Sequence, residues 1–92
     1  MDRQDILIAL KMDLEIINSI QDVFLGDLVE EAIGQIEQQG ITLSFPVSPA
    51  DAGLVRRYAA WLYRKRSSDG PMPVGLRRAL NDRKFHEVMR NA

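Results

Sequence analysis

The sequence contains no cysteine and only one histidine, His86. Disulfide bridges are therefore excluded, and so is a metal site built from clustered histidine and cysteine ligands. The glycines are scattered and form no phosphate-binding loop, and the serines stand in none of the contexts typical of a catalytic nucleophile. The carboxylates lie mostly on predicted helix surfaces, which gives no pair for acid–base catalysis. We therefore expect neither enzymatic activity nor a cofactor.

No run of apolar residues approaches the roughly 20 residues needed to span a bilayer. The first residues, Met1 to Asp5, lack the basic-then-apolar layout of a signal peptide. We expect a protein that is made in a cytoplasm and does not enter a membrane. The 92 residues fit a single domain, residues 1–92, whose small core makes an isolated monomer marginally stable. Because disulfides and metals are excluded, assembly with other chains is the remaining means of stabilisation.

The net charge of −1 hides a strong division along the chain. Residues 1–53 contain two basic and ten acidic side chains, a net charge of −8, whereas residues 54–92 contain ten basic and three acidic ones, a net charge of +7. Two explanations remain open at this point. Acidic and basic helices can neutralise each other within one monomer. Alternatively, the acidic face of one copy binds the basic face of the next, and such heterologous contacts close into rings or continue as filaments.

The apolar spacing predicts an all-α fold, a small bundle of three main helices plus a short N-terminal helix. The short helix covers about residues 3–13 with Asp2 as its cap, and the first main helix covers residues 21–39 and ends at Gly40. The last main helix covers about residues 73–90. The predicted core comprises Leu28, Ile33, Ile36, Leu54, Tyr58, Trp61, Leu62, Leu76 and Leu80.

The second main helix has the most complete start signal. Ser48 is the expected cap, Pro49 occupies the first helical position, and Asp51 stands three residues after the cap, as in a variant of the capping box. The basic residues at its C-terminal end, Arg64 to Arg66, complement the helix dipole. Its broad apolar face belongs to the core, whereas Tyr63 on the flank is the better interface candidate.

Residues 41–47 alternate apolar and polar side chains, which predicts one extended connecting segment. A lone extended segment needs partners for its backbone groups, so it must lie on the surface, fold back as a turn or pair with a neighbouring copy. In the last helix, the apolar residues before and after Asn81-Asp82 do not share one stripe. We therefore expect a kink or a change of packing partners there.

The connection between the first two helices contains three isoleucines, Ile16, Ile17 and Ile20. We expect them to pack under the first main helix, with Asn18 or Ser19 as its cap.

The ten basic side chains of residues 54–92 are compatible with a surface that tracks phosphates. However, residues 67–73 are longer than the turn of a helix-turn-helix motif and contain two prolines, and the overall charge is slightly acidic. We therefore expect loose electrostatic contact with DNA rather than sequence-specific reading. A small cytoplasmic DNA-associated or regulatory helical protein is the alternative function.

Several stretches carry a resemblance to a known family. One is an aromatic helix with a basic end, Tyr58 to Arg66, and another is Met72-Pro73 followed by Leu76-Arg77, Leu80-Asn81, Arg83 and Phe85. In the N-terminal half, Asp5-Ile6 leads into Leu10-Lys11 and Leu14, and Leu28 to Ala32 and Gly40-Ile41 follow. This ordered combination spans about the whole chain and resembles the head-tail connector family of tailed bacteriophages, also called head-completion or adaptor proteins.

The resemblance implies a small helical subunit of a homo-oligomeric ring beneath the portal at the capsid vertex, usually dodecameric like the portal itself. It implies the portal protein on one side, a stopper or tail-completion protein on the other, and DNA passing through the ring. The protein would be made in the host bacterial cytoplasm and act in the virion. The charge division fits such contacts, with acidic residues of one copy facing Arg56, Arg57 or Arg64 of the next. The candidate interface residues are Asp27, Glu30, Glu31, Glu37, Arg56, Arg57, Tyr63, Arg64, Lys65, Arg66, Met72, Arg77 and Arg83.

Overall fold

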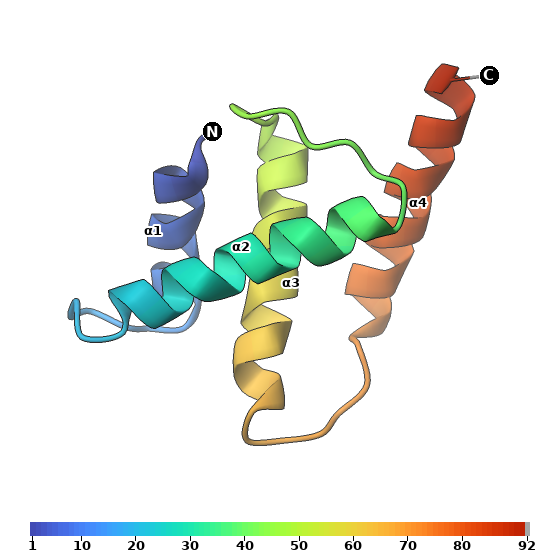
Figure 1. Cartoon of the computed structure of the whole chain (residues 1–92). Coiled ribbons are helices and arrows are strands. Elements are labelled where there is room, and N and C mark those ends of the chain that lie inside the picture. The colour runs from blue at the N-terminus through green and yellow to red at the C-terminus, as the bar shows by residue number, and fades with distance from the viewer. Residues whose placement is uncertain (92) are drawn as a thin grey trace.

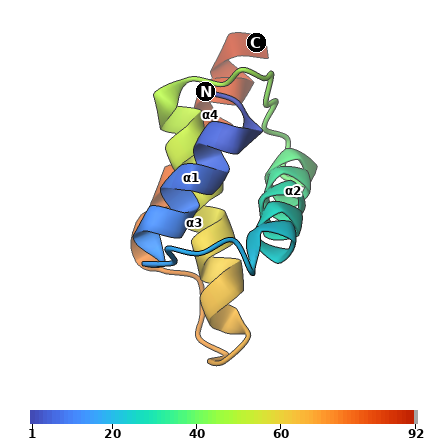
Figure 2. The ribbon, with the colours of Figure 1, turned by 90° about the vertical axis from the view of Figure 1, so that its left-hand side faces the viewer.

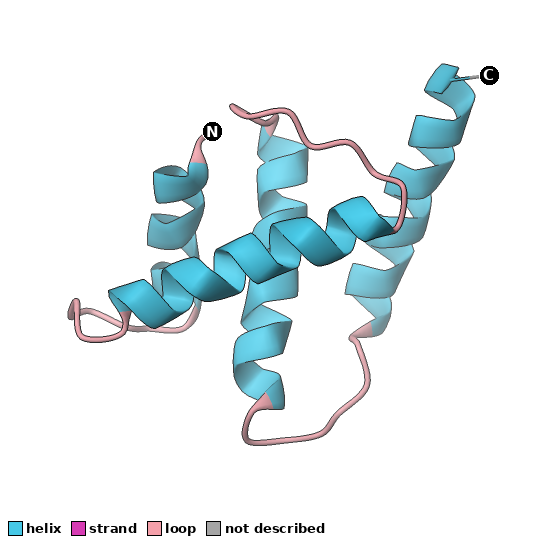
Figure 3. Cartoon of the chain, viewed as in Figure 1, coloured by secondary structure: helices cyan, strands magenta, loops and turns pink. Residues whose placement is uncertain are grey.

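Four helices make up most of the computed structural model, which describes residues 1–91. They are α1 (Arg3–Asp13), α2 (Asp22–Gln38), α3 (Pro49–Lys65) and α4 (Val74–Asn91). Residues 1–91 contain no strand (Figure 3), so the all-α prediction is confirmed. With 11 residues, α1 is the shortest of the four helices.

Helix α3 is the centre of the molecule and packs against all three other helices. Figure 1 shows α1 and α4 on either side of α3, with α2 crossing in front of them. The view turned by 90° (Figure 2) places α2 on one side of the layer formed by α1 and α3. The molecule is accordingly flat, with extents of 45 × 29 × 17 Å. Helix α4 packs against α3, and the C-terminal end of α4 extends beyond the body (Figure 1).

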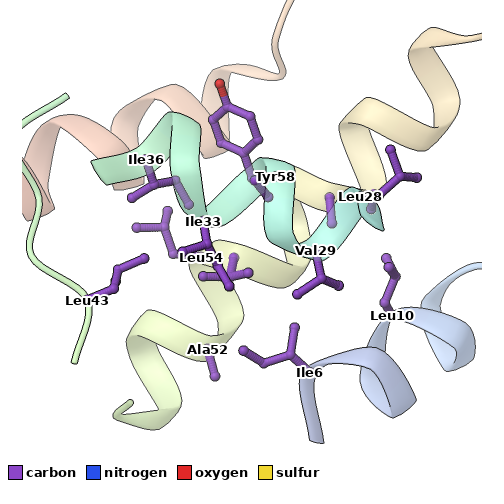
Figure 4. Close-up of a cluster of buried hydrophobic side chains, with 14 of the residues drawn as sticks. Ile6, Leu10, Leu28, Val29, Ile33, Ile36, Leu43, Ala52, Leu54 and Tyr58 are labelled. Carbon is purple, nitrogen blue, oxygen red and sulfur yellow. The ribbon is translucent and has the colours of Figure 1, made fainter. Parts of the chain in front are cut away.

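The core lies where α2 crosses α1 and α3. Figure 4 shows side chains of all three helices and of the segment 41–47 converging there. Seven of the predicted core residues are buried, namely Leu28, Ile33, Ile36, Leu54, Tyr58, Leu76 and Leu80. Trp61 and Leu62 are only half-buried and pack against the edge of the core. They lie towards the C-terminal end of α3, which extends beyond the point where α2 crosses it (Figure 1).

Local capping explains where α1 and α3 begin. The Asp2 side chain accepts a hydrogen bond from the Asp5 backbone N–H, and the Asp5 carboxylate accepts one from the Asp2 N–H, so α1 starts with a complete capping box. At α3, the Ser48 hydroxyl oxygen accepts from the Asp51 N–H at 3.2 Å, and Pro49 follows the cap. The Asp51 carboxylate instead binds Arg83 of α4.

The connection before α2 differs from the prediction. Gln21 occupies the cap position and makes no side-chain cap bond. Asn18 and Ser19 form the turn that precedes the helix: the Asn18 carboxamide oxygen accepts from the Ile20 N–H, and the Ser19 carbonyl accepts from the Asp22 N–H. Ile16 packs against the core, but Ile17 and Ile20 do not pack under α2 and are left in solvent.

Residues 41–47 form an irregular segment without a strand, which bends at residues 45 and 46. Alternate side chains, Ile41, Leu43 and Val47, are buried against the core. Partners for the backbone come from the same chain: Val47 exchanges two hydrogen bonds with Met1, and both the N–H and the carbonyl of Thr42 bind side chains of α4. The segment therefore ties α1 and α4 to the core.

Candidate subunit interface

The four acidic candidates share one exposed face of α2. Asp27, Glu30, Glu31 and Glu37 are all exposed. Glu30 and Glu31 stand one turn after Asp27, and Glu37 follows Glu30 by seven residues, two turns further along the same face. Glu30 binds Arg3 of α1 at 2.6 Å, an ion pair in which both side chains are more than half exposed. Such a pair adds little to stability, because solvent screens it. The face is thus acidic and open to solvent.

Some of the basic candidates are exposed, and others form ion pairs or hydrogen bonds within the chain. Arg57, Arg64, Lys65, Arg66 and Arg77 are exposed. Arg57 and Arg64 line a cleft of about 320 Å³ between α3 and the start of α4, together with Trp61, Pro73 and Leu76. Met72, in the loop beside it, is half-buried against the core.

Arg56 and Tyr63 make contacts within the chain rather than projecting freely. The Arg56 guanidinium forms an ion pair with Asp13 at the end of α1. The Tyr63 hydroxyl donates to the Gln21 side-chain oxygen at 3.2 Å, and its ring lies 6.3 Å from that of Phe24. Arg66 covers both rings, with its guanidinium 4.8 Å from the Tyr63 centroid and 4.6 Å from that of Phe24. These contacts join the end of α3 to the start of α2.

Arg83 is the clearest departure from the predicted interface set. Its guanidinium is directed inward and binds Asp51 at the start of α3, with Nε 2.9 Å from the carboxylate oxygen. It also donates to Glu87 at 3.0 Å and to the Thr42 carbonyl at 2.9 Å. Charge pattern alone predicted an exposed basic residue, but three acceptors converge on this side chain, and two of them, Asp51 and Thr42, come from distant parts of the chain. Arg83 is therefore an internal anchor for α4.

Glu87 completes the same network. It is the one buried charged residue within residues 1–91, with 4% of its surface exposed. The Thr42 N–H donates to its carboxylate at 2.8 Å, and Arg83 donates to the other oxygen. Hydrogen bonding by Thr42, followed by that of Arg83, lowers the pKa of the Glu87 carboxyl from 4.5 to about 2. The hydrogen-bonded group therefore stays charged over the ordinary pH range.

The opposite charges of the two halves are mostly not neutralised inside the monomer. In the part of the chain that the structure describes, only two ion pairs join residues 1–53 to residues 54–92, Asp13 with Arg56 and Asp51 with Arg83. The remaining ion pairs stay within one half. Internal neutralisation thus accounts for a small part of the −8 and +7 division.

Exposed apolar side chains add a feature that the sequence prediction missed. Ile17, Ile20, Phe85, Val88 and Met89 are all largely exposed. The sequence does carry a signal for the exposure of Phe85, Val88 and Met89, because these residues fall outside the apolar stripe formed by Leu76 and Leu80. No such signal distinguished the isoleucines, whose spacing is equally compatible with burial.

Residues 1–91 hold no group of three or more acidic or histidine side chains placed to bind a metal ion. None of the helices described combines the length and apolar character needed to cross a membrane. Comparison with models of protein families, with curated proteins and with solved structures found no match.

Proposed function

We propose that the chain is a structural adaptor of a tailed bacteriophage, a subunit of a ring that sits under the portal and joins the DNA-filled head to the stopper or tail. One observation carries the proposal: the acidic and basic halves remain largely unneutralised within the monomer. A protein with two exposed faces of opposite charge attracts a second copy head to tail, and repetition of that contact generates a ring when the rotation closes.

The exposed positions of the charged residues support this reading. Asp27, Glu31 and Glu37 have no ion-pair partner within residues 1–91, and the same holds for Arg57 and Arg64. In the proposed ring, the acidic face of α2 in one copy attracts the basic end of α3 in the next. Arg56 already pairs with Asp13, so it contributes less to this contact than the sequence predicted.

Passing DNA is a further proposed partner. Exposed basic residues at the end of α3 and the beginning of α4, including Lys65, Arg66 and Arg77, can contact phosphates without reading bases. A ring that lets DNA move through it requires contacts of this weak, sequence-independent kind. The portal and the stopper or tail-completion protein bind the two open sides of the ring.

Co-expression with the portal protein encoded nearest to this chain tests the proposal. Size-exclusion chromatography with light scattering should show a stoichiometric complex whose mass corresponds to a ring on the portal. In the variant Glu30→Lys/Glu31→Lys, complex formation should weaken and lose its dependence on salt. The matched control, Asp69→Lys/Asp82→Lys, changes the net charge equally at exposed acidic residues outside α2 and should leave the complex intact.

The alternative function makes the opposite prediction. A folded monomer that does not bind the portal at low or moderate salt, but does bind DNA with a strong salt dependence, would replace the adaptor by a DNA-associated protein.

A further inference from the structure

The exposed large apolar side chains of residues 1–91 are confined to two edges of the molecule. One group lies on Met1, α1, the α1–α2 connection and the first turn of α2; the other lies on α4. The outer surface of α3 and the rest of α2 carry none. In full, the two groups are Met1, Ile8, Met12, Ile17, Ile20 and Val23, and Val74, Phe85, Val88 and Met89. Because scattered exposed hydrophobics are ordinary, it is this segregation that requires an explanation.

The α1–α2 corner presents the most exposed of these side chains. Ile17, Ile20 and Val23 are 97%, 87% and 81% exposed, and we call them the corner patch. The backbone beneath them is fixed rather than loose. Glu15 adopts a φ of 58°, its N–H donates to the Met12 carbonyl, and the Ile16 N–H donates to the Lys11 carbonyl, which is a Schellman end for α1. The corner patch is therefore held out from the body on a defined turn.

Helix α4 presents the second patch. Phe85, Val88 and Met89 follow the spacing of one helix face and are 63%, 67% and 59% exposed; we call them the α4 stripe. The opposite face of α4 is anchored by Arg83 to Asp51 and by Glu87 to Thr42. Because this network fixes the rotation of the helix, the stripe faces outward in one orientation.

The two edges have opposite charge. Residues 1–23 contain two basic and five acidic side chains, a net charge of −3, and residues 74–91 contain five basic and two acidic ones, a net charge of +3. Figure 1 shows the α1–α2 corner and the C-terminal half of α4 at opposite ends of the molecule. A single chain therefore cannot bring the two patches together, whereas two copies can.

We propose that the corner patch of one copy packs onto the α4 stripe of the next copy. The apolar side chains then leave water together, and the surrounding charges attract. The contact is heterologous, so an open row of copies keeps one free edge at each end until the assembly closes. Closure into a ring on a portal rests on the proposed adaptor function, but the contact between copies does not.

Because the chain has no native cysteine, disulfide trapping can test this contact directly. The double variant Ile20→Cys/Val88→Cys, oxidised as purified full-length protein at high concentration, should give a ladder of covalent oligomers. Each single variant should give no species larger than a dimer, because one cysteine allows only one bond. The control double variant Ile20→Cys/Glu31→Cys places the second thiol on the exposed face of α2 and should give no ladder. All these sites are exposed, so folding should be preserved.

A second measurement uses the protein without cross-links. Ile20→Lys should weaken self-association in sedimentation equilibrium by roughly tenfold or more, since it removes an apolar contact and adds charge opposite a basic edge. Absence of the ladder in the double variant, or an equal ladder in the control, would overturn the proposed contact.

The outcomes also separate this contact from the adaptor function. A ladder in a protein that does not bind the portal would retain the contact and refute the adaptor. Portal binding by Ile20→Lys at wild-type stoichiometry, together with no ladder, would retain the adaptor and refute the contact. The two patches would then be assigned to other partners.

Discussion

Replacing Arg83 by methionine should detach α4 from the body of the protein. The guanidinium makes four hydrogen bonds: two to the Asp51 carboxylate, at 2.9 and 3.4 Å, one to Glu87 and one to the Thr42 carbonyl. Methionine keeps most of the apolar stem of the side chain but leaves these acceptors without their donor. Apart from Leu76, Leu80 and the hydrogen bond between Glu87 and Thr42, little else joins α4 to the body, so the loss concentrates on this helix.

The expected loss follows from the burial of the pair. Removing one partner of a fully buried ion pair costs about 3–5 kcal/mol. The side chains of Arg83 and Asp51 are 19% and 17% exposed, so water screens part of the interaction and we expect about 2–3 kcal/mol. At about 4–8 °C per kcal/mol for a domain of this size, Tm should fall by roughly 10–20 °C.

Thermal and urea unfolding followed by circular dichroism measure this loss, and a double-mutant cycle with Asp51→Asn isolates the pair. We expect a coupling energy of about 1–2 kcal/mol between the two sites. Hydrogen exchange in Arg83→Met should show the amides of α4 losing protection before those of α2 and α3. A loss below about 0.5 kcal/mol, with α4 still protected, would refute the anchoring role.

Three further predictions concern single residues. The Glu87 carboxyl has a pKa of about 2 in the folded protein, against 4.5 ordinarily, so the stability that it contributes is complete above pH 4.5 and is lost as the pH falls towards 2. Glu87→Gln should therefore flatten the fall in Tm between pH 4.5 and pH 2, and identical pH profiles of the two proteins would contradict this role of Glu87. Glu15→Gly should raise the free energy of unfolding by about 1 kcal/mol, because glycine adopts the positive φ without steric cost; an unchanged or lower value in urea titration would count against the strained turn. Ser48→Ala should lower the free energy of unfolding by about 1 kcal/mol through loss of the α3 cap, whereas Ser48→Asp should retain the cap. Equal losses in the two variants would argue against a capping role for Ser48.

Local signals in the sequence were sufficient for most of the fold. The cap residue Asp2, the Ser48-Pro49 start and the positive φ of Gly40 act within a few residues of the helix ends that they define, so the helix boundaries could be predicted closely. Apolar periodicity likewise identified the face of α2 that is buried, because that face is wide and continuous.

Contacts between distant residues could not be predicted in this way. The anchor formed by Arg83 joins residues 32 and 41 positions apart, and only the crossing of α3, α4 and the segment 41–47 brings them together. The exposure of Ile17 and Ile20 has a similar origin, because the turn after α1 decides whether they reach the core. As a result, Arg83 was predicted as an interface residue although it is an internal anchor, and Ile17 and Ile20 were predicted to pack under α2 although they are exposed.

Electron microscopy of the chain co-expressed with the portal protein encoded nearest to it tests whether the chain forms a ring on the portal. We expect a ring of copies seated on one end of the portal around an open channel, with neighbouring subunits in head-to-tail contact. Portal particles that look the same with and without the chain, while the chain itself remains a folded monomer, would contradict it.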